Sequence, residues 1–383
     1  MDRVFFNRII FYDEVKKFFM NSKEKILAKK FVEEINNLAK KIDHVRLMEV
    51  CGTHTVAIFR AGIRQLLPKN IELVSGPGCP VCVTSDDYID KAIAYSKLDD
   101  VIITTFGDML KVPGSNSSLT EAKADGAEVE IIYSPLDSIE IAKKNSSKKI
   151  IFLAVGFETT APTAAATVLA AKNQGVKNLF MLSSQKLVPP ALKMLLNDDE
   201  VNVNGFILPG HVAVVIGSNA FKFLANDYKI PGVVTGFEPL EILRSILQLL
   251  KMITENRSEI LNEYQSVVTD EGNQSAQKIL NQVYEPVNAN WRGIGEIDRS
   301  GLKMRDEFAD FDIEKILPLK VETLTKKTAC RCGEVLRGVI NPTSCPLFGK
   351  NCQPIHAIGP CMVSVEGVCA AWFKYGGGRL INL

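Results

Sequence analysis

Short apolar runs that alternate with helix-like stretches constrain the fold of this chain of 383 residues more than any other feature. Eight such runs predict strands: 45–50, 71–75, 101–105, 128–133, 150–155, 179–182, 205–208 and 232–235. Helix-like segments between them include 88–97, 138–144, 162–173 and 189–197. Strands that alternate with helices are typical of parallel α/β sheets.

Three pairs of segments also indicate an internal repeat. The pairs occur in the same order along the chain: 46–59 with 151–164, 72–83 with 205–216, and 102–110 with 233–240. The repeat predicts two similar parallel-sheet α/β domains, 46–148 and 149–240, that face each other across a cleft. Because any two α/β domains share a strand–Gly–helix pattern, two merely similar units are the alternative to duplication.

The flanking parts of the chain, 1–45 and 241–383, are predicted to hold helical segments and a separate cysteine-rich domain. Apolar residues at three-and-four spacing predict an amphipathic helix over 14–42, and 240–264 predicts a further helical run. Residues 273–312 are predicted to be more irregular. The cysteine-rich region after them has little periodicity, which is typical of a domain organised by metal ligation.

Composition and charge exclude several classes of protein. A formal net charge of +1 gives no electrostatic reason to expect a nucleic-acid partner. The N-terminal segment is interrupted by charges and no segment approaches 18 uncharged apolar residues, so we expect neither a signal peptide nor a membrane span. We therefore expect a cytoplasmic protein, in which structural disulfides are rare and nine cysteines cannot all pair within the chain.

Six of the nine cysteines fall in the last 54 residues: Cys330, Cys332, Cys345, Cys352, Cys361 and Cys369. A chain of this length buries enough apolar surface without crosslinks, so the crowding indicates metal or redox chemistry. No C-x-x-C pair occurs among these six, which argues against zinc-finger geometry, and four thiolates are enough for a 4Fe-4S cluster. Spacing alone leaves open which four would bind, although Cys330 and Cys332 are crowded as ligands of one cluster.

Cys79 and Cys82 form a C-x-x-C pair in the segment Gly76-Pro-Gly-Cys79-Pro-Val-Cys82. The pair follows a predicted strand and precedes a predicted helix, where a helix N-terminus lowers thiol pKa values and favours dithiol redox chemistry. Half of a zinc site is the alternative, although no second C-x-x-C completes it. We therefore expect a redox or metal-binding role for both thiols.

Cys51 and His54 stand in Cys51-Gly-Thr-His54-Thr, at the carboxyl end of the first predicted strand. Parallel sheets place ligand crevices at such ends, so Cys51, Cys79 and Cys82 are expected to converge on one crevice. Thiols together with a histidine suit a soft, low-spin iron better than zinc or magnesium. A small buried cysteine without a function is the alternative for Cys51. His211 aligns with Cys79 in the repeat and is expected to face the same cleft.

The segment Gly156-Phe-Glu158-Thr-Thr-Ala-Pro162-Thr places hydroxyl groups at a predicted helix start, where they are suited either to hold a small anion or to cap the helix. No Walker A motif occurs and no G-x-G-x-x-G opens a helix, so nucleotide binding has no support in the sequence. No G-x-S-x-G elbow points to hydrolysis.

Five motifs together resemble the HypD family of iron–sulfur proteins, which act in the maturation of nickel–iron hydrogenases. The motifs are CGTHT (51–55), GPGCPVCV (76–83), GFETTAPTA (156–164), LPGHV (208–212) and CPLFGKNC with CMVSVEGVCAAW (345–372). The resemblance extends from about residue 15 to residue 376, and it includes all nine cysteines without a departure that removes a functional residue.

The resemblance implies a redox-active assembly scaffold rather than an enzyme that turns over a free metabolite. Its cargo would be an iron carrying two cyanides and one carbon monoxide, Fe(CN)2CO, assembled together with the small chaperone HypC. Cyanide equivalents would arrive as thiocyanate on the partner HypE, and the hydrogenase large subunit would be an indirect partner.

The resemblance also implies roles for the residues near the front of the chain. Cys51 would hold the iron under assembly, and Cys79 and Cys82 would ligate it or deliver electrons to it. Three further side chains are candidates for catalytic positions: His54, His211 and Glu366.

The C-terminal cysteines divide into two groups under the same resemblance. Cys330, Cys345, Cys352 and Cys369 would bind a 4Fe-4S cluster, and Cys332 with Cys361 would form an intermediate dithiol. A different class of function is the alternative: a free-standing thiol–disulfide reductase, fed by the cluster and acting on other proteins. A zinc-stabilised α/β binding protein is a further alternative.

Overall fold

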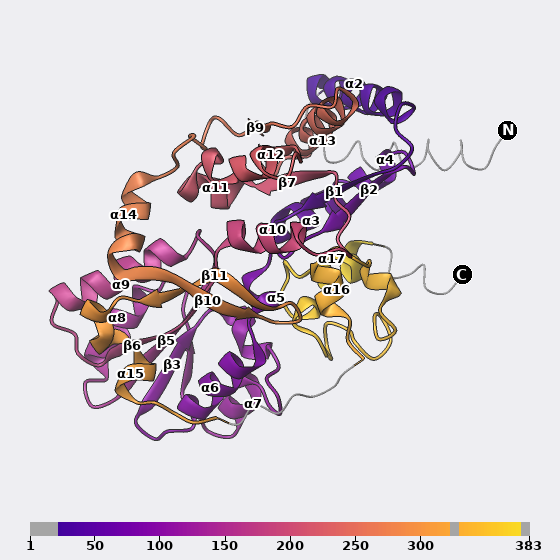
Figure 1. Ribbon diagram of the computed structural model, residues 1–383. Coiled ribbons are helices and arrows are strands. Elements are labelled where there is room, and N and C mark those ends of the chain that lie inside the picture. Colours follow the sequence, from indigo (N-terminus) through magenta and orange to yellow (C-terminus); the bar gives the residue numbers. More distant parts are fainter. Residues whose placement is uncertain (1–21, 322–328, 377–383) are drawn as a thin grey trace.

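The computed structural model describes residues 22–321 and 329–376 of the chain, and within them two parallel sheets form the framework (Figure 1). The five-stranded sheet has the order β2 (Ile71–Ser75), β1 (Val45–Glu49), β7 (Gly205–Pro209), β8 (Gly232–Thr235) and β9 (Ile260–Asn262). The four-stranded sheet has the order β4 (Val129–Ile131), β3 (Val101–Thr105), β5 (Lys149–Gly156) and β6 (Leu179–Gln185). The predicted α/β class with two parallel sheets is therefore confirmed.

The strands form where the sequence has continuous apolar runs rather than alternating ones. Every residue of β3, β7 and β8 is buried, because helices cover both faces of a parallel sheet and leave no solvated face. The eight predicted strands are all present, and their observed ends differ from the predicted ends by three residues at most. The strand β9 was not predicted.

The sheets do not follow the predicted division of the chain at 148/149. From 46–148, β1 and β2 belong to the five-stranded sheet, whereas β3 and β4 belong to the four-stranded sheet. The chain crosses to the four-stranded sheet after β2 and returns after β6. The join between the two parts of the five-stranded sheet is parallel pairing of β1 with β7, in which Leu47 lies opposite Gly205.

The pairing of segments that the internal repeat predicts is also wrong. Its second pair equates β2 with β7, yet these strands lie on either side of β1 in one sheet. The sheets do resemble each other in topology. Numbered in their own chain order, the strands of the four-stranded sheet run 2-1-3-4 and those of the five-stranded sheet run 2-1-3-4-5, so that β1, β2, β7 and β8 correspond to β3, β4, β5 and β6.

Four helices occupy the predicted places between strands: α6 (Asp86–Ser96), α8 (Asp137–Lys144), α9 (Ala161–Asn173) and α10 (Val188–Leu196). The predicted helix 14–42 corresponds to α2 (Ser22–Ala39), and residues 14–21 lie outside the described residues. The predicted run 240–264 is helical only as α13 (Pro239–Thr254), after which the chain forms β9. The hydrophobic side of α13 packs in the same core as α2 and the five-stranded sheet.

Shorter helices connect the remaining elements. The α-helices are α3 (Gly52–Arg60), α4 (Ile63–Leu66), α5 (Pro80–Val83), α7 (Leu119–Ala124), α11 (Gly210–Ile216), α12 (Lys222–Asn226), α14 (Gln274–Val283), α15 (Ile313–Ile316), α16 (Cys332–Leu336) and α17 (Val368–Tyr375). The 3-10 helices are η1 (Gly107–Lys111), η2 (Ser218–Phe221), η3 (Asp306–Phe311), η4 (Pro342–Ser344) and η5 (Pro360–Met362). In the described part of the chain, no helix combines the length and the apolarity that a membrane span needs.

An antiparallel hairpin, β10 (Tyr284–Trp291) with β11 (Gly295–Met304), occupies the region that was predicted to be more irregular. Figure 1 shows this hairpin running across the molecule from α14 toward the C-terminal segment that holds α16 and α17. At its tip, the Arg292 backbone N–H donates to the Val83 carbonyl at 2.9 Å, and the Arg292 guanidinium pairs with Asp86 at 2.6 Å. The hairpin therefore fixes the start of α6 and the end of α5.

One hydrophobic core joins the sheets, the hairpin and the C-terminal segment. It contains Phe157 beyond β5, Trp291 of the hairpin and Leu336 of α16, together with residues of β1, β2, β7 and β8. Three cysteines are buried in this same core: Cys79, Cys82 and Cys361. The redox candidates from the front and from the end of the chain therefore share one interior.

Candidate functional site

The candidate site lies where the strand order of the five-stranded sheet reverses, between β1 and β7. Ligands of open parallel sheets bind at the carboxyl ends of the strands at such a point, because the two flanking loops diverge there. Cys51 directly precedes α3 after β1, with extended backbone angles, and His211 lies in the first turn of α11 after β7. A cavity of about 590 Å³ opens at this place.

Both sheets and the C-terminal segment contribute to the cavity wall. Cys51 and Thr53 line it from the five-stranded sheet, Thr159 lines it from the loop after β5, and Glu366 lines it from the C-terminal segment. His211 also lines it, so it faces the same cleft as Cys51, as expected. The hydroxyl-bearing segment after β5 therefore adjoins the same cavity as Cys51.

The Cys51 thiol is held in a poorly solvated place beside an acidic side chain. Burial raises its pKa, a Thr53 hydrogen bond lowers it, and the Glu366 carboxylate raises it. The Thr53 hydroxyl donates to Glu366 Oε1 at 2.7 Å, which ties the carboxylate to the first turn of α3. Without a bound cation the cysteine is therefore a protonated thiol, and binding a metal would release that proton.

Two histidines enclose one phenylalanine ring next to the cavity. Ring centroids lie 4.5 Å apart for His54 and Phe237, and 4.0 Å apart for His211 and Phe237. Burial lowers the pKa of His54 to about 4, so its ring is neutral. Its Nε2 lies 2.9 Å from the Gly236 carbonyl, which only accepts, so Nε2 carries the proton. Among the described residues no group hydrogen-bonds the remaining lone pair, on Nδ1.

Two glycines allow the loops around Cys51 to approach each other. A Cβ at Gly78 would lie 1.5 Å from the Val50 carbonyl oxygen, and a Cβ at Gly52 would lie 2.4 Å from the Glu366 carbonyl oxygen. The Gly52 N–H donates to the Gly78 carbonyl at 3.2 Å, which joins the Cys51 loop to the dithiol loop. Glycine is therefore required at both positions for the loops to meet.

Cys79 and Cys82 form a close, buried pair of free thiols. Their Sγ atoms lie 2.7 Å apart, and the Cys82 backbone N–H donates to Cys79 Sγ at 3.3 Å. Cys79 is 2% exposed and Cys82 is 0% exposed. The neighbours Gly78 and Pro80 line the cavity, whereas the two thiols themselves do not. The three front cysteines therefore adjoin one site, but only Cys51 opens into it.

The expectation that a helix N-terminus lowers the dithiol pKa values is wrong for Cys82. Burial raises the pKa of this thiol well above its ordinary value, and neighbouring thiols do not reverse that shift. The helix α5 has only four residues, so its dipole is small, and the apolar core around it disfavours a thiolate. Cys82 is therefore a neutral thiol when the pair is reduced.

Cys361 connects this dithiol to the C-terminal cysteines. Hydrogen bonding to the Cys369 thiol lowers the pKa of Cys361, while hydrogen bonding to Cys82 and burial raise it, and the net direction is upward. The Cys82 Sγ also lies 3.8 Å from the carbonyl oxygen of Pro360, the residue before Cys361. The thiols of Cys79, Cys82, Cys361 and Cys369 thus form a row in which each interacts with the next.

Comparisons with known proteins show the family to which the chain with this site is related. The HypD family, described as "Hydrogenase formation hypA family", matches residues 26–376. The hydrogenase maturation factor HypD of Escherichia coli (strain K12) is 43% identical over 333 residues, which cover 86% of this chain and 89% of that protein. The chain belongs to the HypD family. Two further HypD proteins are similar: that of Rhodobacter capsulatus, 40% identical and covering 95% of this chain and 99% of that protein, and that of Azotobacter vinelandii, 42% identical and covering 87% and 90%.

The iron–sulfur cluster expected of the HypD family can be tested against the C-terminal donor set. Cys345 and Cys352 are buried in one small apolar core with Phe348 and Met362, and Cys369 packs against that core. Soft thiol donors in apolar surroundings suit a 4Fe-4S cluster. In the two described ranges, no group of three or more His, Cys, Asp or Glu side chains is arranged to hold a metal ion, so the ligands are suitable in type but not gathered.

The predicted pairing of Cys332 with Cys361 in this HypD chain stays a prediction. Among the side-chain interactions of Cys330, the Cys332 thiol has the largest effect on its pKa, which it raises together with burial. Cys361 interacts with Cys82 and Cys369. A Cβ on Gly359 would lie 2.7 Å from Cys330 Sγ, so the turn that carries Cys361 passes close to the Cys330–Cys332 segment.

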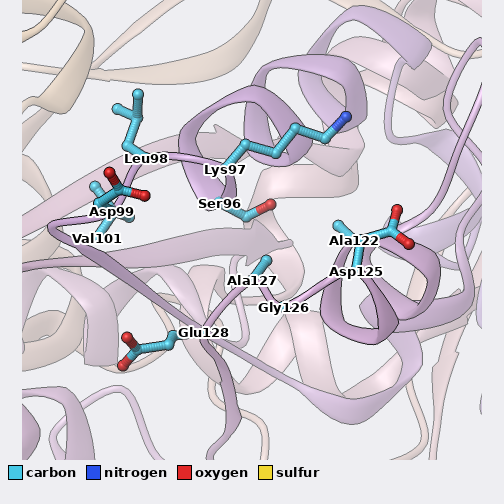
Figure 2. A pocket seen from close by; sticks show the side chains of 10 residues that line it. All are labelled: Ser96, Lys97, Leu98, Asp99, Val101, Ala122, Asp125, Gly126, Ala127 and Glu128. Atoms are coloured by element: carbon cyan, nitrogen blue, oxygen red, sulfur yellow. The ribbon is translucent and has the colours of Figure 1, made fainter.

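A second hollow in this HypD chain, of about 450 Å³, lies at the amino end of β3 and has no comparable chemistry. Its charged residues are Lys97, Asp99, Asp125 and Glu128, and Figure 2 shows that their charged ends do not converge on one point. Two residues were not singled out from the sequence: Phe237, whose ring contacts His54 and His211, and Thr53, which donates to Glu366. His211 and Glu366 line the cavity described above, whereas His54 does not. The one sequence signal for Thr53 was its position three residues after Val50, where the first predicted strand ends.

Proposed function

We propose that this protein is a hydrogenase maturation factor and that it serves as the scaffold on which Fe(CN)2CO is assembled together with HypC. The observation that carries the proposal is the position of Cys51. It lines a cavity shared by both sheets, and the loop that holds it is hydrogen-bonded to the loop of a buried dithiol. A metal cargo held there would be shielded from bulk water and would lie next to a source of two electrons.

In this proposal the iron is the cargo, and Cys51 is its anchor. The iron would displace the thiol proton, which burial retains in the empty state. His54 supports the role because it is neutral and keeps an unused lone pair on Nδ1. Glu366 and His211 stand at the wall of the same cavity, where they can accept and pass on the proton that Cys51 releases.

The dithiol would supply the electrons for cyanide transfer. When cyanide arrives as a thiocyanate, the sulfur–carbon bond breaks with two electrons, the cyanide ion goes to the iron, and the donor sulfur takes up one proton as a thiol. Oxidation of Cys79 and Cys82 to a disulfide provides two electrons and two protons, of which one proton is left over. The 2.7 Å separation of the two sulfurs supports this step.

Cys361 and Cys332 together would restore the dithiol after each transfer. Cys361 would attack Cys82 of the disulfide and release the Cys79 thiol. Cys332 would then attack Cys361 and release the Cys82 thiol, which leaves a Cys332–Cys361 disulfide for the cluster to reduce. The Cys361 thiol interacts with Cys82 on one side and with Cys369 on the other, so a thiol–disulfide exchange at Cys82 needs no large movement. Cys330, Cys345, Cys352 and Cys369 would hold the 4Fe-4S cluster, and a bound cluster supplies electrons one at a time. The dithiols convert these single electrons into the pair that cyanide release needs.

A free-standing thiol–disulfide reductase is the alternative function. The same row of interacting thiols favours it. The burial of Cys79 and Cys82 argues against it, because a protein substrate has to reach one sulfur along the line of its disulfide. If the protein is an assembly scaffold, the same burial is useful, because it protects the two thiols from oxidation by other molecules.

Infrared spectroscopy of the purified complex with HypC tests the proposal. Wild-type protein is expected to show cyanide and carbonyl bands, and the Cys51→Ala variant is expected to lose them together with the cargo iron. The Thr53→Ser variant keeps the hydroxyl that binds Glu366 and serves as the matched control, which should retain the bands. Persistence of the bands in Cys51→Ala would show that another residue anchors the iron.

A further inference from the structure

A separate polar cavity of about 310 Å³ lies at the edge of the four-stranded sheet, away from the cysteines. Its wall is formed by the end of β6, the first turn of α6, both strands of the hairpin and the start of α15. The backbone of this hairpin closes over the end of β6, because Leu187 N–H donates to the Ser300 carbonyl at 2.8 Å. The volume is at the lower end of the range of small-molecule pockets, roughly 300–1,000 Å³.

Two buried polar side chains from the end of β6 line this cavity. Gln185 is 2% exposed, and within the described residues its Oε1 atom has no hydrogen-bond partner. Lys186 is 3% exposed, and its Nζ donates to the Asn290 carbonyl at 2.9 Å. An ammonium group has three N–H donors, so Lys186 can still serve a second acceptor. A buried acceptor without a partner costs free energy, which a ligand that donates to it would recover.

The charges in the cavity wall are complementary but not all paired. Lys91 pairs with Glu314 at 2.6 Å, Lys303 pairs with Glu285 at 3.2 Å, and the Asp312 carboxylate caps α15. In the described part of the chain, Asp87 and Lys186 form no ion pair with each other. Both residues line the cavity. Burial lowers the pKa of Lys186 to about 8, and the charge of Asp87 acts against that shift.

We infer that this cavity binds a small zwitterion, a molecule of amino-acid size that carries one carboxylate and one ammonium group. The carboxylate would accept from Lys186 Nζ and from the Ser184 hydroxyl, and the ammonium would donate to Gln185 Oε1 and to Asp87. A simple anion would leave Gln185 Oε1 and the Asp87 carboxylate without a donor, and a simple cation would leave Lys186 Nζ without a second acceptor. Only a ligand with both charges satisfies the unpaired groups together.

Calorimetric titration of the full-length, anaerobically purified protein tests this inference. The probes are glycine, β-alanine and γ-aminobutyrate, in which the distance between the two charges increases stepwise. At least one of them is expected to bind saturably, with a Kd below about 1 mM. Acetate carries only the carboxylate and methylammonium only the ammonium group. Each should bind at least about tenfold more weakly than the best zwitterion, because each lacks one set of charged hydrogen bonds.

Two variants locate the binding in this cavity. Lys186→Met and Asp87→Asn should each weaken the best probe by at least about tenfold. Asp87 is only half-buried, so its variant tests the site even if Lys186→Met fails to fold. Asp99→Asn, an exposed position in the hollow of Figure 2, is the matched control and should bind as the wild type does.

Three results would overturn the inference. The first is that none of the three zwitterions binds saturably, which would mean that water fills the cavity. The second is that acetate alone binds as tightly as the best zwitterion, which would make this a plain anion site. The third is that both variants bind like the wild type, which would place the probe elsewhere.

Discussion

Replacing Gly78 by alanine should separate the Cys51 loop from the dithiol loop. A Cβ at this position would lie 1.5 Å from the Val50 carbonyl oxygen and 2.6 Å from the Cys51 Cα. Both neighbours are backbone atoms, so no side chain can rotate away to make room. The loops would have to move apart by more than an ångström, which would stretch the Gly52–Gly78 hydrogen bond beyond its present 3.2 Å.

The cost of this change can be approximated from its parts. Forced overpacking costs about 1–3 kcal/mol, and a lost buried backbone hydrogen bond costs about 1–3 kcal/mol. The lower entropy of the unfolded alanine chain returns about 0.4–1 kcal/mol. We therefore expect a loss of about 3 kcal/mol in the free energy of unfolding, which corresponds to a fall in Tm of roughly 4 °C for a chain of this length.

Thermal unfolding and thiol labelling together measure the effect. In the wild type, Cys79 and Cys82 are buried and should react slowly with a maleimide in the native state, whereas in Gly78→Ala both should react faster. Gly107→Ala is the matched control, because among the described residues its Cβ would meet nothing closer than Ile131 Cγ2 at 3.8 Å. A Gly78→Ala protein with the Tm and labelling rates of this control would refute the close approach of the two loops.

Two further predictions concern pH. The pKa of His54 is about 4 in the folded protein against 6.5 ordinarily, so the unfolded state binds the extra proton and stability should fall as the pH decreases from 6.5 toward 4, by up to about 3 kcal/mol. Denaturant titrations should show this slope in the wild type and its loss in His54→Gln. Burial raises the pKa of Glu158 to about 7 from 4.5, so the folded state retains that proton and stability should fall as the pH rises from 4.5 to 7. Glu158→Gln keeps an acceptor for the Val188 N–H and should be more stable than the wild type at pH 8, by as much as about 3 kcal/mol, but not at pH 4; equal stability at pH 8 would contradict the buried carboxyl.

Strands in this protein were predictable because burial on both faces leaves continuous apolar runs. The assignment of strands to sheets was not, because it depends on pairing between distant segments. Leu47 and Gly205 lie opposite each other across β1 and β7, and nothing local to either segment specifies that partner. The hairpin was missed because the strand Tyr284–Trp291 mixes partly buried and exposed polar residues without clear alternation.

Part of the candidate site was predictable for a simple physical reason. Cys51 and His211 both follow strands, and the carboxyl ends of parallel strands meet at one edge, so they could share a cavity even though the repeat assigned them to different domains. The contact of both His54 and His211 with Phe237 was not predictable, because it joins loops after three different strands. The link from Cys82 to Cys361 likewise depends on how the C-terminal segment packs.

A row of neighbouring thiols joins the dithiol beside the Cys51 cavity to the C-terminal cysteines, and this connection can be measured directly. Wild-type protein is oxidised until Cys79 and Cys82 form a disulfide and is then reduced anaerobically with a one-electron donor. The return of these two thiols is followed by alkylation and mass spectrometry. Both thiols should return in the wild type and in the neighbouring control Met362→Leu, and they should stay oxidised in Cys361→Ala. Their return at the wild-type rate in Cys361→Ala would contradict the connection.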